Sequence, residues 1–349
     1  MTYESPMLTW PGAVPPPPAS PDQGVPWHYG EPHIEQRNLV AGVGAVDLSH
    51  LSVVAVTGAD RLSWLHSLTS ADVAQLPAGA SATALILDPH GHVEHELHVI
   101  DDGGTTWLIV EPGSADGLVE YLNRMRFMLD VAVRDASAEV AVVWLPRREA
   151  DPGHRPTWLM PAEFAGTGAT PAGTDRGGDA GKYVAARPGT LVGAQVLVPR
   201  PELADVMAAA GTPAGTWALE ALRTGAAVPR VGCETDHRTI PHEVGWIGPA
   251  VHLAKGCYRG QETVARVHNM GRPPRRLVLL HLDGSDGDLP AHGDPVVLGG
   301  RQVGWVGTAA RHYELGPVAT AVVKRSTPDG ADVMVGEGTA AKVEGVVLA

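Results

Sequence analysis

Apolar residues recur along the chain with two different periods, and each period predicts one type of element. After Ser114 the apolar positions Leu118, Leu122 and Met125 are three or four residues apart, which is typical of one face of a helix. Continuous or alternating apolar runs predict strands instead. We expect helices at residues 60–68, 114–129, 201–210 and 216–225, and strands at residues 45–48, 52–56, 82–88, 92–100, 106–110 and 139–145.

The pattern changes after Pro274, where short apolar runs are separated by glycine-bearing turns. The sequence Leu298-Gly299-Gly300-Arg301 suits a two-residue hairpin, because glycine supplies the positive φ that such turns require. Residues 276–349 are therefore predicted to form a small antiparallel β-barrel or sandwich, and the chain as a whole is predicted to be α+β. The strands are expected at residues 276–282, 295–298, 302–306 and 318–323.

Two segments lack sustained periodicity. Residues 1–26 contain the run Pro15-Pro16-Pro17-Pro18, and such a composition favours extended geometry over packing, so we expect a proline-rich tail. Residues 147–182 are rich in Pro, Gly, Thr and Asp, which indicates a long surface loop or a partly ordered insertion. Between the tail and the C-terminal β domain, residues 27–275 are predicted to form the main folded region.

Composition narrows the class of protein. The 349 residues carry 26 basic and 39 acidic side chains, a net charge of −13, which disfavours stable nucleic-acid binding. No apolar stretch is long enough for a membrane helix, and no secretory signal pattern stands at the start of the sequence. With only two cysteines, the chain is expected to be cytoplasmic and reduced. The scarcity of lysine relative to arginine indicates a GC-rich bacterial genome.

Residues 255–262, Lys-Gly-Cys-Tyr-Arg-Gly-Gln-Glu, hold the densest group of chemically active side chains, and we call them the KGC segment. Gly256 and Gly260 permit close backbone approach to a ligand. Lys255 stands beside Cys257, and a neighbouring cation lowers the pKa of a thiol, so Cys257 is a candidate reactive thiol. The alternative is structural: Cys257 is a small buried residue in a tight turn and Lys255 is a solvated charge.

The KGC segment, followed by Ala265-Arg266 and Gly271, resembles the YgfZ branch of the glycine cleavage T-protein (aminomethyltransferase) superfamily. Further similarities are Thr239-x-Pro241-x-Glu243 and the segment Gly304-x-Val306-Gly307-Thr308, and the resemblance covers about residues 38 to 325. It implies two interleaved α+β subdomains and a C-terminal β-barrel around a central hole that receives tetrahydrofolate. It also implies a role in iron–sulfur cluster assembly or repair, with indirect effects on tRNA modification and with iron–sulfur proteins or assembly factors as partners.

The resemblance also assigns candidate site residues. The catalytic candidates are Cys257, Lys255 and His95. The residues expected to bind folate are Lys255, Gly256, Cys257, Tyr258, Gly260, Gln261, Glu262, Arg223 and Glu243.

The sequence departs from the aminomethyltransferases at the reacting carbon. Those enzymes carry an Asp-Asp pair, and the matching positions here are His95 and Glu96. In a strand, His95 shares one face with Val93 and Leu97, so it interrupts an apolar face and is either a site residue or a satisfied core histidine. Imidazole lacks the fixed negative charge of Asp, so we expect no aminomethyltransferase activity.

A second departure lies at the pterin. The superfamily places a Glu against the amino-pyrimidine edge of the ring, and Gly225 stands at the matching position here. Loss of one charge-assisted bidentate contact costs about 2 kcal/mol, an affinity loss on the order of thirtyfold, unless a carboxylate such as that of Glu243 substitutes. Folate binding is therefore expected to be weakened.

Other groups of residues support weaker hypotheses. The imidazoles of residues 90–98 alternate along a strand, but this polar face is more simply a solvated sheet surface, and we expect no metal site. Arg266, Arg272, Arg275 and Arg276 form a basic cluster, which is either a solvated linker or a clamp for a folate polyglutamate tail or an acidic partner. Two other functions stay open: a folate-dependent aminomethyltransferase or demethylase using His95 or Glu96 as base, and a protein-binding scaffold.

Overall fold

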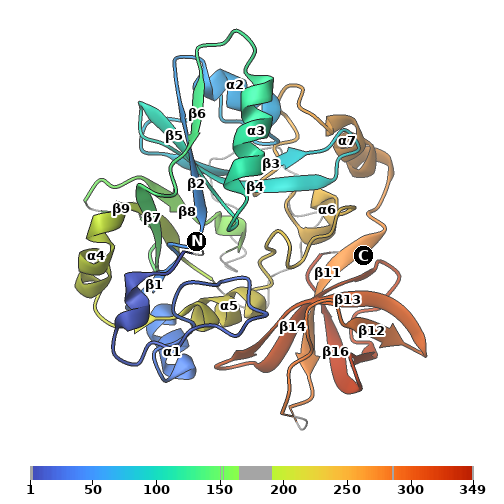
Figure 1. Cartoon of the computed structure of the whole chain (residues 1–349). Coiled ribbons are helices and arrows are strands. Elements are labelled where there is room, and N and C mark those ends of the chain that lie inside the picture. Colours follow the sequence, from blue (N-terminus) through green and yellow to red (C-terminus); the bar gives the residue numbers. More distant parts are fainter. Residues whose placement is uncertain (1–2, 150, 152, 165–190, 285–286, 348–349) are drawn as a thin grey trace. The chain divides into compact units, whose positions relative to one another are not determined.

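The computed structural model describes residues 3–149, 151, 153–164, 191–284 and 287–347 (Figure 1). The chain divides into two compact units that alternate along the sequence. The first unit comprises residues 1–84, 95–161 and 192–219, and the second comprises residues 85–94, 162–191 and 220–349. The predicted C-terminal β domain therefore groups with about 55 residues that precede it, and most of the predicted insertion at 147–182 lies outside the described residues.

One five-stranded sheet has the order β3-β4-β5-β2-β6. Its strands are β2 (Ser52–Thr57), β3 (Ser81–Leu87), β4 (Val93–Asp101), β5 (Thr105–Val110) and β6 (Ala132–Asp135). The β2 and β5 strands pair antiparallel from Ser52 opposite Val110 to Thr57 opposite Thr105. The helix α3 (Ala115–Met125) packs on β2 and β6 through its buried side, which includes Leu118 and Leu122, and α2 (Arg61–Leu68) follows β2.

A second five-stranded sheet, in the first unit, has the order β10-β1-β7-β9-β8. Its strands are β1 (Ala45–Asp47), β7 (Val140–Leu145), β8 (Thr157–Leu159), β9 (Ala194–Pro199) and β10 (Pro213–Ala214). The β1–β10 pair is parallel and the others are antiparallel. Helix α4 (Leu203–Ala209) supplies Leu203 and Met207 to the apolar core on this sheet, and α1 (Pro32–Val40) packs near β10.

The proline-rich N-terminal segment packs on the first unit, contrary to the expectation that it would not pack. Met7, in the short 3₁₀ helix Pro6–Thr9, is fully buried in the core of the second sheet, and Val25 is fully buried as well. Hydrogen bonds from Ser5 to Asp47 and between His50 and Asp22 fasten the segment. The composition of the segment predicted no packing, but the burial of two apolar side chains, Met7 and Val25, is enough to attach it.

The C-terminal strands form a closed barrel in the second unit, with the order β11-β14-β13-β12-β15-β16 (orange to red in Figure 1). They are β11 (Arg275–Leu282), β12 (Pro295–Leu298), β13 (Arg301–His312), β14 (Gly316–Lys324), β15 (Asp332–Val335) and β16 (Thr339–Gly345). The predicted hairpin joins β12 to β13, with φ of 57° at Gly299 and 77° at Gly300. Closure leaves no exposed sheet edge and encloses an apolar core that includes Val278, Val306 and Val343.

The remaining helices are α5 (Thr216–Gly225), α6 (Pro241–Val244) and α7 (Gln261–Met270). In the second unit, α6 packs on both α7 and β11. Most predicted elements occur within two residues of their expected bounds, but nine were not predicted, namely α1, α6, α7, β6, β8, β9, β10, β15 and β16. The α7 sequence is polar on average, and only Val264 among its well-described side chains is deeply buried.

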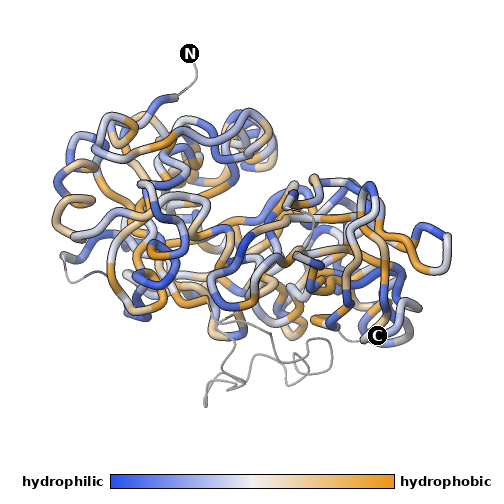
Figure 2. Tube along the Cα trace, turned by 90° about the horizontal axis from the view of Figure 1, so that it is seen from below, coloured by the Kyte–Doolittle hydropathy of each residue, from blue (hydrophilic) through white to orange (hydrophobic). Residues whose placement is uncertain are grey.

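Polar and apolar residues alternate over short distances along the coloured part of the trace (Figure 2). Among the described residues, no helix combines the length and apolar character needed to cross a membrane.

Candidate functional site

In the second unit, the KGC segment leads into α7, and its last two residues are the first two of that helix. Gly260 caps the helix with φ of 81°, and a Cβ at this position would lie 2.6 Å from the carbonyl oxygen of Asp88. Glycine is therefore required at 260, because the segment lies directly against the turn between β3 and β4. Gly256 differs: no described atom lies within 4 Å of an added Cβ, so its backbone faces open space.

The thiol and the lysine of the segment have opposite exposures. Cys257 is exposed, whereas Lys255 is only 8% exposed and its Nζ lies 5.0 Å from the centre of the Tyr258 ring, within cation–π range. Tyr258 is itself buried, and burial raises its pKa to about 12, so the phenol is neutral near pH 7. The structural alternative of a buried thiol and a solvated lysine is wrong on both counts.

The polar residues that follow Cys257 hold the segment in place. Arg259 pairs with Glu94 at 2.9 Å, and the side-chain amide of Gln261 donates to the carbonyl oxygen of Lys255 at 3.5 Å. Glu262 pairs with Arg266 one helical turn away at 2.8 Å, but both side chains are mostly exposed. An exposed pair of this kind contributes little stability. Glu262 is therefore the last residue of the segment and is not fixed by the core.

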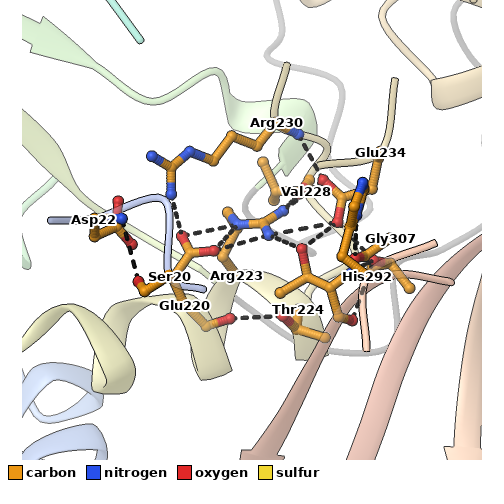
Figure 3. Close-up of polar contacts among 12 residues, drawn as sticks. Ser20, Asp22, Glu220, Arg223, Thr224, Val228, Arg230, Glu234, His292 and Gly307 are labelled. Atoms are coloured by element: carbon orange, nitrogen blue, oxygen red, sulfur yellow. Dashed lines mark hydrogen bonds and ion pairs between the residues drawn. The ribbon is translucent and has the colours of Figure 1, made fainter. Parts of the chain in front are cut away.

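Arg223 on α5 lies between two carboxylates (Figure 3). Its Nε and Nη2 donate to Glu220 at 2.9 to 3.0 Å, and its Nη1 donates to Glu234 at 2.9 Å and to the Val228 carbonyl at 2.6 Å. Nη2 also donates to the hydroxyl of Thr308 at 2.6 Å. Arg223 is 94% buried, and its guanidinium is surrounded by acceptors from the chain itself. Folate binding by Arg223 remains a hypothesis, and these contacts give the side chain a structural role.

Glu234 is the centre of the same network and was not predicted from the sequence. It is fully buried and accepts hydrogen bonds from the hydroxyls of Thr320 and Thr308 at 2.6 and 2.7 Å. Burial alone raises the pKa of Glu234, but Arg223 and the two hydroxyls outweigh burial, and the pKa is lowered. Gly307 makes room for it, since a Cβ there would lie 2.9 Å from Glu234. In the sequence, the segment Gly304-x-Val306-Gly307-Thr308 was the signal that could have indicated this network.

Glu243 on α6 is also engaged within the chain. It is 1% exposed and accepts from Nε and Nη2 of Arg275, each at 2.8 Å, while its Oε2 accepts from the Ile240 amide at 3.2 Å. Arg275 also binds Asp236 at 2.6 and 3.0 Å. A carboxylate held by a bidentate arginine and a backbone amide has few lone pairs left. Glu243 is therefore a poor substitute for the missing carboxylate at position 225.

The basic cluster is divided by these contacts. Arg275 belongs to the Glu243 network, and Arg276 is 1% exposed and donates to the carbonyl oxygens of Val347 and Thr327. Two of the four arginines thus tie the first barrel strand to its neighbours. Arg275 and Arg276 therefore belong neither to a solvated linker nor to a clamp for a polyanion.

At position 225 the space for a side chain is already filled. A Cβ on Gly225 would lie 2.6 Å from Cδ2 and 3.0 Å from Nε2 of His312, the last residue of β13. His312 is 7% exposed, and its Nδ1 accepts hydrogen bonds from the amides of Glu314 and Leu315 at 3.2 and 3.1 Å. The residues present therefore do not fit a carboxylate anchor for a pterin at this position.

His95 lies in β4 of the first unit, whereas Cys257, Lys255, Arg223 and Glu243 lie in the second. On its strand, Leu97 is fully buried and Glu94 is exposed, while His95 itself is half-buried. It interrupts the apolar face, as the alternation along the strand indicated.

The His, Cys, Asp and Glu side chains limit the metal and thiol chemistry open to the chain. Among the described residues, no group of three His, Cys, Asp or Glu side chains is arranged to hold a metal ion. The other cysteine, Cys233, is free like Cys257, but burial, together with Glu234, raises the pKa of its thiol to about 12. Cys233 is therefore an unreactive thiol, and Cys257 is the accessible one.

A pocket of about 460 Å³ lies in the first unit and is lined in part by Tyr3, His50 and Arg200. The Arg200 guanidinium lies 4.3 Å from the centre of the Tyr3 ring, and Nη2 donates to the Ser49 carbonyl at 2.8 Å. His50 pairs with Asp22 at 2.9 Å. These contacts attach the N-terminal segment.

The architecture, two five-stranded sheets with helices and a closed six-stranded barrel, is that of the glycine cleavage T-proteins, and it confirms the predicted fold class. The crystal structure of the glycine cleavage system aminomethyltransferase T from Bartonella henselae matches with a TM-score of 0.71 and 20% sequence identity, covering 95% of this chain and 93% of that chain.

Sequence comparisons support a place in the T-protein superfamily. Residues 24–146 match the GCVT N-terminal domain. The chain is 27% identical over 327 residues to the aminomethyltransferase of Streptomyces avermitilis, covering 86% of this chain and 83% of the relative. It is 29% identical over 293 residues to the aminomethyltransferase of Bacillus licheniformis, covering 79% and 78%.

Proposed function

We propose that this chain is a YgfZ-like member of the T-protein superfamily that supports iron–sulfur cluster assembly or repair in the bacterial cytoplasm. The KGC segment carries the proposal. It presents an exposed thiol, Cys257, next in sequence to the buried ring of Tyr258, over which the buried Lys255 ammonium lies, and Gly260 fixes the segment at the start of α7. Effects on tRNA modification would follow indirectly, through enzymes that contain clusters.

The thiol is the reactive group in this proposal. Sulfur is a good ligand for iron and a good nucleophile, and both uses require access and thiolate character. Cys257 is exposed, whereas Cys233 is half-buried, and burial raises the pKa of its thiol to about 12. The iron–sulfur proteins or assembly factors served by the chain would approach at this exposed face of the segment.

Tetrahydrofolate is the proposed cofactor, and it would supply a one-carbon unit when bound. The superfamily similarity and the open space at Gly256 support binding beside the KGC segment. Arg223 and Glu243 would shape the folate site without binding the ligand through their charged groups. Their polar atoms are engaged by Glu220, Glu234 and Arg275. The expected weakening of folate binding follows from Gly225, where no carboxylate is present.

The relatives named aminomethyltransferase favour a second candidate, a folate-dependent aminomethyltransferase or demethylase. That reaction would need a base at His95 or Glu96. A neutral or cationic imidazole supplies no fixed negative charge at the reacting carbon, so we propose that this chain does not transfer aminomethyl groups.

Complementation tests the proposed function. In a bacterial strain that lacks its own protein of this type, the wild-type chain is expected to restore the activity of an iron–sulfur enzyme. Cys257→Ala is expected to lose at least tenfold of that restored activity, because the accessible thiol is removed. The matched control is Cys233→Ala, which removes the half-buried thiol of raised pKa, and immunoblotting verifies equal protein levels. Full restoration by Cys257→Ala contradicts the thiol mechanism and favours a protein-binding scaffold.

A further inference from the structure

We propose that two copies of this chain associate through a two-fold interface, in which an exposed apolar tip on each copy enters a pocket on the other. The tip is the segment 127–129, Phe-Met-Leu, between α3 and β6 (Figure 1). The pocket is the cavity of about 460 Å³ lined in part by Tyr3, His50 and Arg200. Both features belong to the first unit, and the proposed association is independent of the iron–sulfur function.

The tip exposes three consecutive large apolar side chains, at 79% for Phe127, 100% for Met128 and 43% for Leu129. Single apolar side chains on a surface are normal, but contiguous ones mark interaction sites. Phe127 also has a φ of 48°, in the left-handed region that bulky residues rarely adopt. Strain of this kind persists only where surrounding contacts fix it, and it is concentrated at functional positions.

Hydrogen bonds fix the backbone on both sides of the tip. The Trp64 indole donates to the carbonyl oxygen of Met125 at 3.0 Å. The Asp130 amide donates to the Asp60 carboxylate at 2.9 Å, and the Asp130 carboxylate accepts from the amide of Ala59 at 3.2 Å. A contact surface that is fixed in advance loses little conformational freedom on association. The tip is therefore a preformed knob.

The pocket lies at the opposite end of α3. Its lining includes Gly113, Ala115 and Asp116 at the start of that helix, whereas the tip follows the last turn. The eleven residues of α3, at about 1.5 Å each, place its two ends about 16 Å apart. Leu51 and Ala138 add apolar surface to the pocket. When two copies of α3 lie antiparallel, each tip therefore comes to the pocket of the other copy.

The charges on α3 are complementary to themselves in this arrangement. Asp116 and Glu120 are exposed in the first half of the helix, and Arg124 and Arg126 are exposed at its end. A two-fold interface uses the same surface on both copies, so antiparallel helices set the acidic half of one against the basic end of the other. A parallel arrangement would set like charges together.

One register serves all these contacts. When Asp116 of one copy faces Arg126 of the other, Glu120 lies beside Arg124 of the other copy, and Met128 reaches the pocket. Within one chain, Glu120 and Arg124 form only an exposed pair at 3.7 Å, with side chains 77% and 67% exposed, so both are available to a second copy. The tip and the pocket thus match in polarity and in the sign of the charges around them.

Sedimentation equilibrium on the full chain tests the association. The mass of the wild-type chain is expected to rise with concentration from 36.5 kDa towards twice that value. Phe127→Gly should weaken the dimer at least about tenfold, because it removes an apolar anchor. Glycine accepts the positive φ, so the folded monomer should keep its stability in urea. Met128→Ser should act in the same way, and Met334→Ser, at an exposed methionine on β15, is the matched control.

A mixing experiment separates this contact from other modes of association. Ala138→Trp fills the pocket and should also weaken the dimer at least about tenfold. An equal mixture of Phe127→Gly and Ala138→Trp pairs one intact tip with one intact pocket, so the mixed dimer should be tighter than the dimer of either variant alone. Glu120→Arg and Arg124→Glu should each weaken the dimer, and their combination should restore it.

Three results overturn the inference. The first is a wild-type chain that stays monomeric up to high micromolar concentration, which would leave the tip to a different partner. The second is a dimer that Phe127→Gly and Met128→Ser do not weaken, or that Met334→Ser weakens equally. The third is a mixed dimer no tighter than those of the separate variants. The complementation by Cys257→Ala is measured separately, so failure of the dimer and failure of the proposed function are distinguishable.

Discussion

At the scale of the residue, position 225 shows how one side chain depends on another far away in the sequence. Gly225 is the last residue of α5, and His312 is the last residue of β13. The His312 ring occupies the space that a side chain at position 225 would need. Arg223 shows the same dependence, because its guanidinium also donates to the hydroxyl of Thr308, on β13, at 2.6 Å. The sequence singled out Gly225 and Arg223, but it did not identify His312 and Thr308 of β13 as their neighbours.

Gly225→Ala tests the steric claim. Alanine in a helix is favoured over glycine by about 1 kcal/mol, but overpacking against a buried ring costs about 1–3 kcal/mol, so we expect net destabilisation in urea denaturation. The control is Gly117→Ala in α3, where no described atom lies within 4 Å of the new Cβ, and it should be neutral or stabilising. Adding His312→Ala should relieve the Gly225→Ala defect; if it does not, the ring is not the obstacle.

At the scale of the element, α6 owes its position to buried polar groups as much as to apolar ones. Glu243 is bound by Arg275 of β11, and His242 is fully buried at a ring-centre distance of 6.4 Å from His268 of α7. The strands of the barrel were largely predictable because their apolar periods are strong. The short helices α6 and α7 were not, since tertiary contacts rather than local periodicity define their buried faces.

The His242 environment predicts a pH dependence of stability. Burial, with a smaller effect of His268, lowers the pKa of His242 to about 4 in the folded chain, whereas an unfolded histidine titrates near 6.5. Between these values the unfolded chain binds more protons, so the free energy of unfolding falls as pH falls from about 6.5 to 4, by about 3 kcal/mol in total. Urea titrations across this range measure the loss. His242→Asn should flatten the profile, whereas His281→Gln should leave it unchanged; an identical slope in His242→Asn would contradict the assignment.

At the scale of the whole molecule, the two units alternate along the chain, and the candidate residues are distributed between them. His95 belongs to the first unit and the KGC segment to the second. The activity of the relatives therefore cannot be transferred from the fold alone, because it depends on which side chains occupy the reacting positions.

An enzymatic assay tests the absence of aminomethyl transfer. The chain is incubated with aminomethyl-lipoyl carrier protein and tetrahydrofolate, and methylenetetrahydrofolate formation is expected to stay at the background rate. His95→Asp restores the carboxylate at that position and serves as a gain-of-function comparison, with a glycine cleavage aminomethyltransferase as positive control. Product above background with the wild-type chain would favour the enzymatic alternative.

The sequence by itself determined the α+β class, most strands and helices, and the C-terminal β domain, because apolar periodicity is a local property of the chain. It also singled out the KGC segment and the missing carboxylates at His95 and Gly225. Only the tertiary structure decided that the proline-rich segment packs through Met7 and Val25, that Arg223 and Glu243 are paired within the chain, and that His312 fills the space beside Gly225. These facts depend on contacts between residues distant in sequence, and no local pattern encodes the partner of a buried charge or the neighbour of an absent side chain.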